Sequence, residues 1–206
     1  SISEIKNDRI RTCFEYLEIR NSIELFYISD IPKQLGLGGS SSFTVGILNA
    51  LYKYKNQKAY PEKLAREACK IEIDILKNPI GKQDQYAAAL GGINYLKFWS
   101  DGTVSSKPIL IDEELIESLF NNLLYIYLGK THDASDILTD VNNNLIEKNE
   151  IFLKMRDLTN DLYTELMRRN IDQFKYALME NWKLKKLTSK NVSNNFSSDS
   201  ATISIN

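Results

Sequence analysis

Cysteine, histidine and proline are scarce in this 206-residue chain, which contains two, one and four of them respectively. The two cysteines, Cys13 and Cys69, lie far apart and support neither a disulfide framework nor a cysteine-rich zinc site. So few cysteines are typical of a protein from a reducing compartment, and we therefore expect a cytoplasmic location.

Long apolar runs and an excess of charge are also missing. No run approaches the ~18 apolar residues of a membrane-spanning helix, and the N-terminal stretch SISEIKNDRIRTC is charged. The 26 basic residues nearly balance the 27 acidic ones, which excludes a uniformly basic surface for nucleic acid or anionic lipid. We expect a soluble protein that binds neither nucleic acid nor membrane and holds any anion by local groups.

The chain is long enough for one large or two compact domains, at ~100–200 residues per domain. The sequence pattern changes near residues 105–120, which predicts domains at 1–112 and 113–190. Residues 191–206 are rich in Asn and Ser and predict a disordered tail. Periodicity predicts helices at 3–20, 43–55, 61–77, 111–121, 133–147, 150–168 and 171–188, strands at 22–32 and 123–129, and a hairpin turning at 100–103.

The loop GLGGSSS at residues 36–42 stands between a predicted strand and a strongly apolar helix. Glycines allow the backbone to approach a ligand closely, and the free amides at a helix start attract anions. The loop has neither the lysine of GxxxxGK[ST] nor the GxGxxG pattern, so it would be a nucleotide loop of another kind. The alternative is a flexible connector capped by serine. The buried helix that follows favours a rigid phosphate-binding loop.

Two carboxylates complete the candidate site. Glu72 falls on the apolar face of the predicted helix at 61–77, where a charge is costly unless a cation or donor meets it. It is therefore either half of a buried ion pair or a ligand of Mg²⁺, which prefers oxygen and would suit Glu72 with Ser40. Asp84 lies in a predicted loop before the helix AAALGG, either as a turn residue or as the base of a phosphoryl-transfer site.

Three segments together resemble the GHMP sugar and isoprenoid kinases, and within them the heptose 7-phosphate kinases. They are SDIPKQLGLGGSSSFTVGILNAL at 29–51, LAREACKIEIDILKNPIGKQDQYAAALGGINYLKF at 64–98, and ASDIL at 134–138. The match is continuous over 29–98 and looser to about residue 188. The resemblance implies an α+β fold: a GHMP kinase-like, mixed-sheet N-terminal domain followed by a partial, ferredoxin-like helical C-terminal domain.

The resemblance also implies an ATP-dependent enzyme whose partners would be a small-molecule sugar phosphate and, in a homodimer, a second copy of the chain. It would phosphorylate the anomeric hydroxyl of D-glycero-D-manno-heptose 7-phosphate, giving a 1,7-bisphosphate for nucleotide-activated heptose and surface polysaccharide. The alternatives are a kinase for fucose or galactose, or a catalytically impaired nucleotide-binding fragment of such a kinase.

Residue roles follow from the same resemblance. Asp84 would be the catalytic base, and Ser40 and Glu72 would ligate Mg²⁺. The phosphates of ATP would be held by Gly36, Leu37, Gly38, Gly39, Ser40 and Ser41. The substrate would be contacted by Lys82, Gln85 and His132.

The chain departs from the family pattern in three places. Gly39 stands where relatives usually have Ser, and His132 stands where relatives tend to have Arg, which binds phosphate with a fixed charge and fork that neutral His lacks. The family's first strand with its Arg-rich loop and its late glycine-rich segment are not in this sequence. We therefore expect a fragment, a frameshifted product, or a sequence from which these parts were left out.

Overall fold

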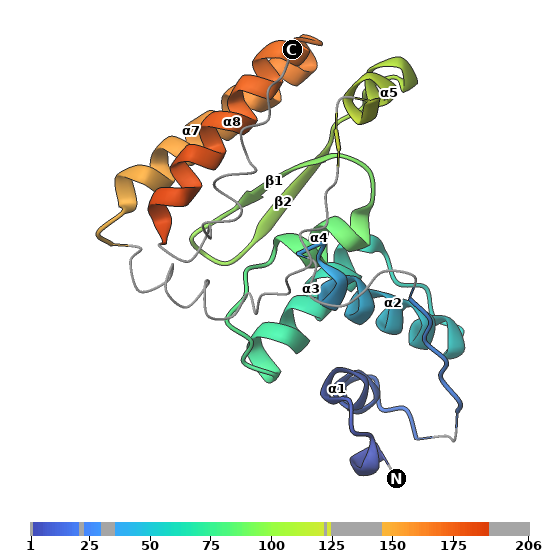
Figure 1. Cartoon of the computed structure of the whole chain (residues 1–206). Coiled ribbons are helices and arrows are strands. Elements are labelled where there is room, and N and C mark those ends of the chain that lie inside the picture. The colour runs from blue at the N-terminus through green and yellow to red at the C-terminus, as the bar shows by residue number, and fades with distance from the viewer. Residues whose placement is uncertain (1, 21–22, 30–35, 122, 125–145, 190–206) are drawn as a thin grey trace. The chain divides into compact units, whose positions relative to one another are not determined.

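The computed structural model describes residues 2–20, 23–29, 36–121, 123–124 and 146–189. It forms two compact units that divide between Leu110 and Ile111. The first unit contains α1 (Asp8–Tyr16), α2 (Gly39–Tyr54), α3 (Pro61–Cys69), a π-helical segment η2 (Lys70–Ile75), α4 (Gln83–Leu90) and the strands β1 (Asn94–Phe98) and β2 (Val104–Pro108), after a 3₁₀ turn η1 (Ile2–Glu4) (Figure 1).

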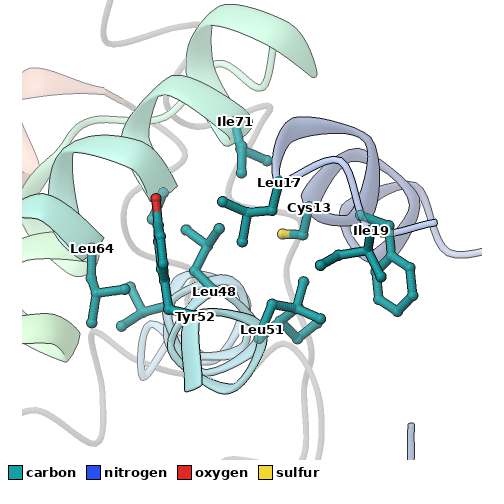
Figure 2. Packing of buried hydrophobic residues seen from close by; sticks show 12 residues of the cluster. Cys13, Leu17, Ile19, Leu48, Leu51, Tyr52, Leu64 and Ile71 are labelled. Carbon is teal, nitrogen blue, oxygen red and sulfur yellow. The ribbon is translucent and has the colours of Figure 1, made fainter. Parts of the chain in front are cut away.

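The core of the first unit lies where α1, α2, α3 and η2 meet. Each helix turns its apolar face inward, and Figure 2 shows these side chains converging. Buried residues labelled there are Cys13, Leu17, Ile19, Leu48, Leu51, Tyr52, Leu64 and Ile71. Because α2 is held by this core along its length, its first turn has a fixed position.

A second, smaller cluster joins α3 and α4 to the hairpin. Ala65, Cys69 and Tyr86 are buried there, with Leu96 and Val104 of the two strands packed against them. The strands pair antiparallel, with Leu96 opposite Ser106. The Asp101 side chain accepts a hydrogen bond from the Thr103 amide at 2.8 Å and so fixes the predicted turn.

The second unit contains α5 (Glu113–Asn121), α7 (Asn149–Met167) and α8 (Ile171–Thr188). α7 and α8 pack along one another and are joined by a short turn (Figure 1). Asn170 caps α8 by accepting a hydrogen bond from the Gln173 amide. In that turn Arg169 pairs with Asp112 and Glu114, which ties α5 to the helical pair.

The α+β class is confirmed, although the sheet of the described residues is two antiparallel strands rather than a mixed sheet. The strand predicted at 22–32 is wrong over residues 23–29, which have no regular structure. A strand needs a hydrogen-bonding neighbour, and in the described part of the chain only β1 and β2 pair. Phe26 and Ile28 are accordingly 85% and 89% exposed.

Other predicted elements fare differently. The helices predicted at 111–121, 150–168 and 171–188 are confirmed within a few residues. The strand predicted at 123–129 is wrong at residues 123–124, and its remainder, the helix at 133–147 and the tail at 191–206 lie outside the described residues. The ferredoxin-like assignment of the second unit stays a prediction. None of the helices within the described ranges is long and apolar enough to cross a membrane.

Candidate active site

Glu72 is the centre of a buried hydrogen-bond network in the first unit. Its side chain is 0% exposed, and it accepts hydrogen bonds from α1, α2 and α4. The donors to Oε1 are Arg9 Nε, Ser40 Oγ and Thr44 Oγ1, each at 3.0 Å, and the donors to Oε2 are Ser41 Oγ at 2.9 Å and Gln85 Nε2 at 2.6 Å. Of the two roles predicted for Glu72, the structure shows the buried ion pair, with Arg9, and the role as a Mg²⁺ ligand stays a prediction.

The network keeps Glu72 ionised. Burial by itself raises the pKa of this carboxyl group, but donors that favour the charged form outweigh burial. These donors are Arg9, Gln85, Ser41 and Ser40. The pKa of Glu72 therefore lies below its ordinary value of 4.5, and the group is an anion at neutral pH.

The π-helical segment η2 determines which side chains face this network. The Leu76 amide bonds to the Ile71 carbonyl five residues back, which widens the turn beyond the α-helical spacing. Ile71 and Glu72 are both fully buried, whereas Ile75 is 46% exposed. An uninterrupted α-helix over 61–77 would place Ile75 on the apolar face with Ile71, so the widened turn explains why Ile75 is exposed.

The start of α2 supplies backbone groups for an anion. Gly36 and Gly38 have φ values of +71° and +65°, which L residues rarely adopt. The helix begins at Gly39, and its first ladder bond runs from the Ser42 amide to the Gly38 carbonyl at 2.9 Å. Gly38 has no side chain to cap the helix, so the amides of residues 39–41 lie before the first ladder bond and can bind an anion.

Asp84 packs directly against this loop. A Cβ added to Gly38 would lie 3.3 Å from Asp84 Cγ and 3.5 Å from Asp84 Oδ2. The prediction that Asp84 lies in a loop is wrong, because α4 begins at Gln83 and takes Asp84 into its first turn. The next residue, Gln85, bonds to Glu72. α4 thus carries Asp84 beside the glycine loop and is bonded to the buried carboxylate through Gln85.

The three residues predicted to contact substrate are placed differently. Gln85 is fully buried against Glu72, and Lys82 Nζ donates to the Gly102 carbonyl of the hairpin turn at 2.7 Å. His132 lies outside the described residues. A substrate role for each of them stays a prediction.

The donor chemistry of the site fits a hard divalent cation. Ser40 Oγ and Glu72 Oε1 are 3.0 Å apart, and Mg²⁺ prefers oxygen ligands completed by phosphate and water. The described residues contain no group of three or more His, Cys, Asp or Glu side chains that could hold a metal by themselves. A cation here would therefore take Ser40 and Glu72 as its protein ligands, and water or the oxygens of a bound phosphate would complete its shell.

Comparison with known proteins agrees with this geometry. The family model described as "GHMP kinases N terminal domain" matches residues 8–92, which include the glycine loop, Glu72 and Asp84. Residues 8–92 are a GHMP kinase N-terminal domain. The segment that carries the match includes every described residue of the network around Glu72.

Curated proteins similar to this chain are kinases with different substrates in their names. It is 30% identical, over 84% of its length, to the D-glycero-alpha-D-manno-heptose 7-phosphate kinase of Campylobacter jejuni. Identity is 22% over 82% of the chain to a bifunctional fucokinase/GDP-fucose pyrophosphorylase of Arabidopsis thaliana, and 23% over 80% to a mevalonate kinase of Methanothermobacter thermautotrophicus. The aligned regions span 52%, 16% and 52% of these relatives.

A solved structure shares the fold. It is a D-glycero-D-manno-heptose 1-phosphate kinase from Bacteroides thetaiotaomicron, similar with a TM-score of 0.69 and 24% identity. The match covers 95% of this chain and 58% of that one. At this identity the likeness supports the fold alone.

Arg9 and Thr44 belong to the site but were not predicted from the sequence. Thr44 follows Ser40 by four residues, so the two lie on the same face of α2, and the SSSFT spacing could have revealed it. Arg9 lies 63 residues before Glu72 on another helix. Only tertiary packing joins them, and no local pattern marks Arg9.

Two adjacent residues of the glycine loop, Gly38 and Gly39, give a matched pair of variants. Gly38→Ala is expected to weaken MgATP binding at least about tenfold, because it strains a left-handed residue by ~1–2 kcal/mol and pushes on Asp84. Gly39→Ala should leave affinity within about twofold, since a Cβ there meets no atom within 4 Å. Calorimetric titration of both variants checks this. Equal losses of MgATP affinity in the two variants would contradict a special requirement for glycine at position 38.

Proposed function

We propose that this chain is the core of an ATP-dependent sugar kinase. It would phosphorylate the anomeric hydroxyl of D-glycero-D-manno-heptose 7-phosphate to the 1,7-bisphosphate, for nucleotide-activated heptose and surface polysaccharide in the cytoplasm. The observation that carries the proposal is how near Asp84 lies to Gly38, since a Cβ added to Gly38 would lie 3.3 Å from Asp84 Cγ. This nearness supports Asp84 as a base beside the backbone that would bind the phosphates.

The chemistry assigns a role to each group. The α2 amides at 39–41 bind the phosphates of ATP, and the carboxylate of Asp84 accepts the proton of the sugar hydroxyl. That hydroxyl oxygen forms a bond to the γ-phosphorus while the bond from the γ-phosphorus to the ADP oxygen breaks, so the displaced electron pair leaves on ADP. Ser40 and Glu72 would hold Mg²⁺, which supplies positive charge to the phosphate oxygens when bound.

Similarity favours a heptose phosphate as substrate. Identity is 30% to the heptose 7-phosphate kinase, against 22% and 23% to the fucokinase and the mevalonate kinase, over similar shares of this chain. The higher sequence identity supports a heptose phosphate as substrate, while the site geometry is compatible with phosphoryl transfer to any alcohol. Substrate and reaction type therefore need separate tests.

Calorimetry and a substrate panel provide these tests. The 206-residue chain is titrated with MgATP, and ADP release is then measured with heptose 7-phosphate, fucose, galactose and mevalonate. The proposal predicts MgATP binding and stimulation by heptose 7-phosphate alone. Stimulation by another substrate would correct the substrate class. Binding without stimulation by any of them would make this chain a nucleotide-binding module and the enzyme assignment wrong.

A further inference from the structure

Arg9 occupies the carboxylate oxygen that the proposed metal would need. Its Nε donates to Glu72 Oε1 at 3.0 Å, and the same oxygen accepts from Ser40 Oγ. Mg²⁺ bound between Ser40 and Glu72 would have to approach this oxygen. The guanidinium and a divalent cation cannot both take this position, since both are positively charged and both need the same lone pairs.

Arg9 is suited to leave this position, whereas Glu72 is not. The Arg9 side chain is 34% exposed and the Glu72 side chain 0%. Arg9 forms the only ion pair that Glu72 makes within the described ranges. Without Arg9 or another cation, a fully buried carboxylate would be costly. The structure thus pairs a fixed anion with a cation that can reach water.

We propose that Arg9 is an internal counter-ion of Glu72 that competes with the metal. Binding of a divalent cation releases the guanidinium of Arg9, and the return of Arg9 favours release of the cation. Either the guanidinium or the divalent cation lies at Glu72 in each state, so the carboxylate is never buried alone. This inference rests on the proposed function, because it concerns the metal of that site.

The competition is tested by metal binding to the full chain without ATP or sugar. Mn²⁺ replaces Mg²⁺, because both prefer oxygen ligands, and free Mn²⁺ is measured by electron paramagnetic resonance. Arg9→Gln should bind Mn²⁺ at least about fivefold more tightly than the wild type, the lower end of usual coupling between sites. Arg9→Lys retains the charge and should show little gain.

Two controls separate competition from a general change of charge. Arg11 lies on the same helix and bonds to the Ile5 carbonyl and to Asp8 rather than to Glu72. Arg11→Gln should change Mn²⁺ affinity less than twofold, and Arg9→Gln should have no effect in a Glu72→Gln background. Equal gains from Arg9→Gln and Arg11→Gln, a gain that survives Glu72→Gln, or no gain in Arg9→Gln would each overturn the proposal.

A wild-type measurement decides the question even if Arg9→Gln does not fold. The NMR signal of the Arg9 Nε–H should shift during a Mg²⁺ titration, with the midpoint at the dissociation constant measured for Mg²⁺ by displacement of Mn²⁺. A signal that stays constant while the metal site fills would overturn the proposal. Because sugar and ATP are absent, this result is independent of the kinase assay, and either can fail while the other holds.

Discussion

Asp84→Asn is expected to lower sugar-stimulated ADP release at least about 100-fold, the usual scale for loss of a general base. The amide has nearly the shape of the carboxylate but cannot accept the proton of the attacking hydroxyl. MgATP affinity should stay within about twofold, because the phosphates are held by amides of α2 and the substitution fits beside Gly38. Steady-state kinetics and calorimetry on the same preparation measure the two effects.

Asp74→Asn is the matched control for this prediction. Asp74 is an exposed carboxylate on η2, two residues after Glu72, and its loss should leave turnover unchanged. Turnover of Asp84→Asn equal to the wild type would remove Asp84 from the mechanism. A large loss of MgATP affinity instead would make Asp84 part of the nucleotide site rather than a base.

Glu72→Gln is expected to lower the free energy of unfolding of the first unit by about 3 kcal/mol. Removing one partner of a buried ion pair typically costs ~3–5 kcal/mol, and partial exposure of Arg9 places this pair at the lower end. The neutral amide also brings two donors to a place where five side chains already donate. Three kcal/mol is a large part of the ~5–15 kcal/mol that stabilises most domains.

Urea unfolding measures this loss with a probe inside the first unit. The chain has two tryptophans, Trp99 and Trp182, so fluorescence in a Trp182→Phe background reports Trp99 near the hairpin. The Glu72→Gln midpoint should fall by roughly 2 M, for a slope of ~1–3 kcal/mol per molar urea. Asp74→Asn should shift the midpoint little. Similar shifts for both variants would mean that the network adds no stability.

The ion pair of Arg9 and Glu72 makes the stability of the first unit depend on pH in a definite direction. Folding lowers the pKa of Glu72 below its ordinary value of 4.5. The stability that ionised Glu72 contributes is therefore fully present above pH 4.5, and it is lost as the pH falls through the pKa of the folded state. The stability difference between the wild type and Glu72→Gln should therefore be largest near pH 6 and shrink below about pH 4.5. A difference that grows in acid would contradict the ionised state of Glu72.

Features defined by local sequence could be predicted. The hairpin turn follows from Asp101 and Gly102, and Pro61 marks the start of α3, because each depends on the residue type at one position. The glycine loop, Glu72 and Asp84 could each be singled out on the same grounds. Their meeting in one site depends on packing, and the family resemblance predicts it.

Features that depend on distant partners could not be predicted. Arg9 reaches Glu72 only because α1 packs against α2 and η2. In the π-helical turn a backbone amide bonds to the carbonyl five residues back instead of four. The sequence KIEIDI is compatible with either spacing. The apolar run at 23–29 reads as a strand by propensity, yet a strand also needs a neighbour, and the run forms no regular structure.

The most direct test of the account is the identity of the product. The chain is incubated with MgATP and D-glycero-D-manno-heptose 7-phosphate, and the product is analysed by ³¹P–¹H correlation NMR. The proposed activity gives a second phosphate whose phosphorus couples to the anomeric proton, formed in the wild type and about 100-fold more slowly in Asp84→Asn. No new sugar phosphate, a phosphate on another carbon, or equal rates in the two proteins would contradict it.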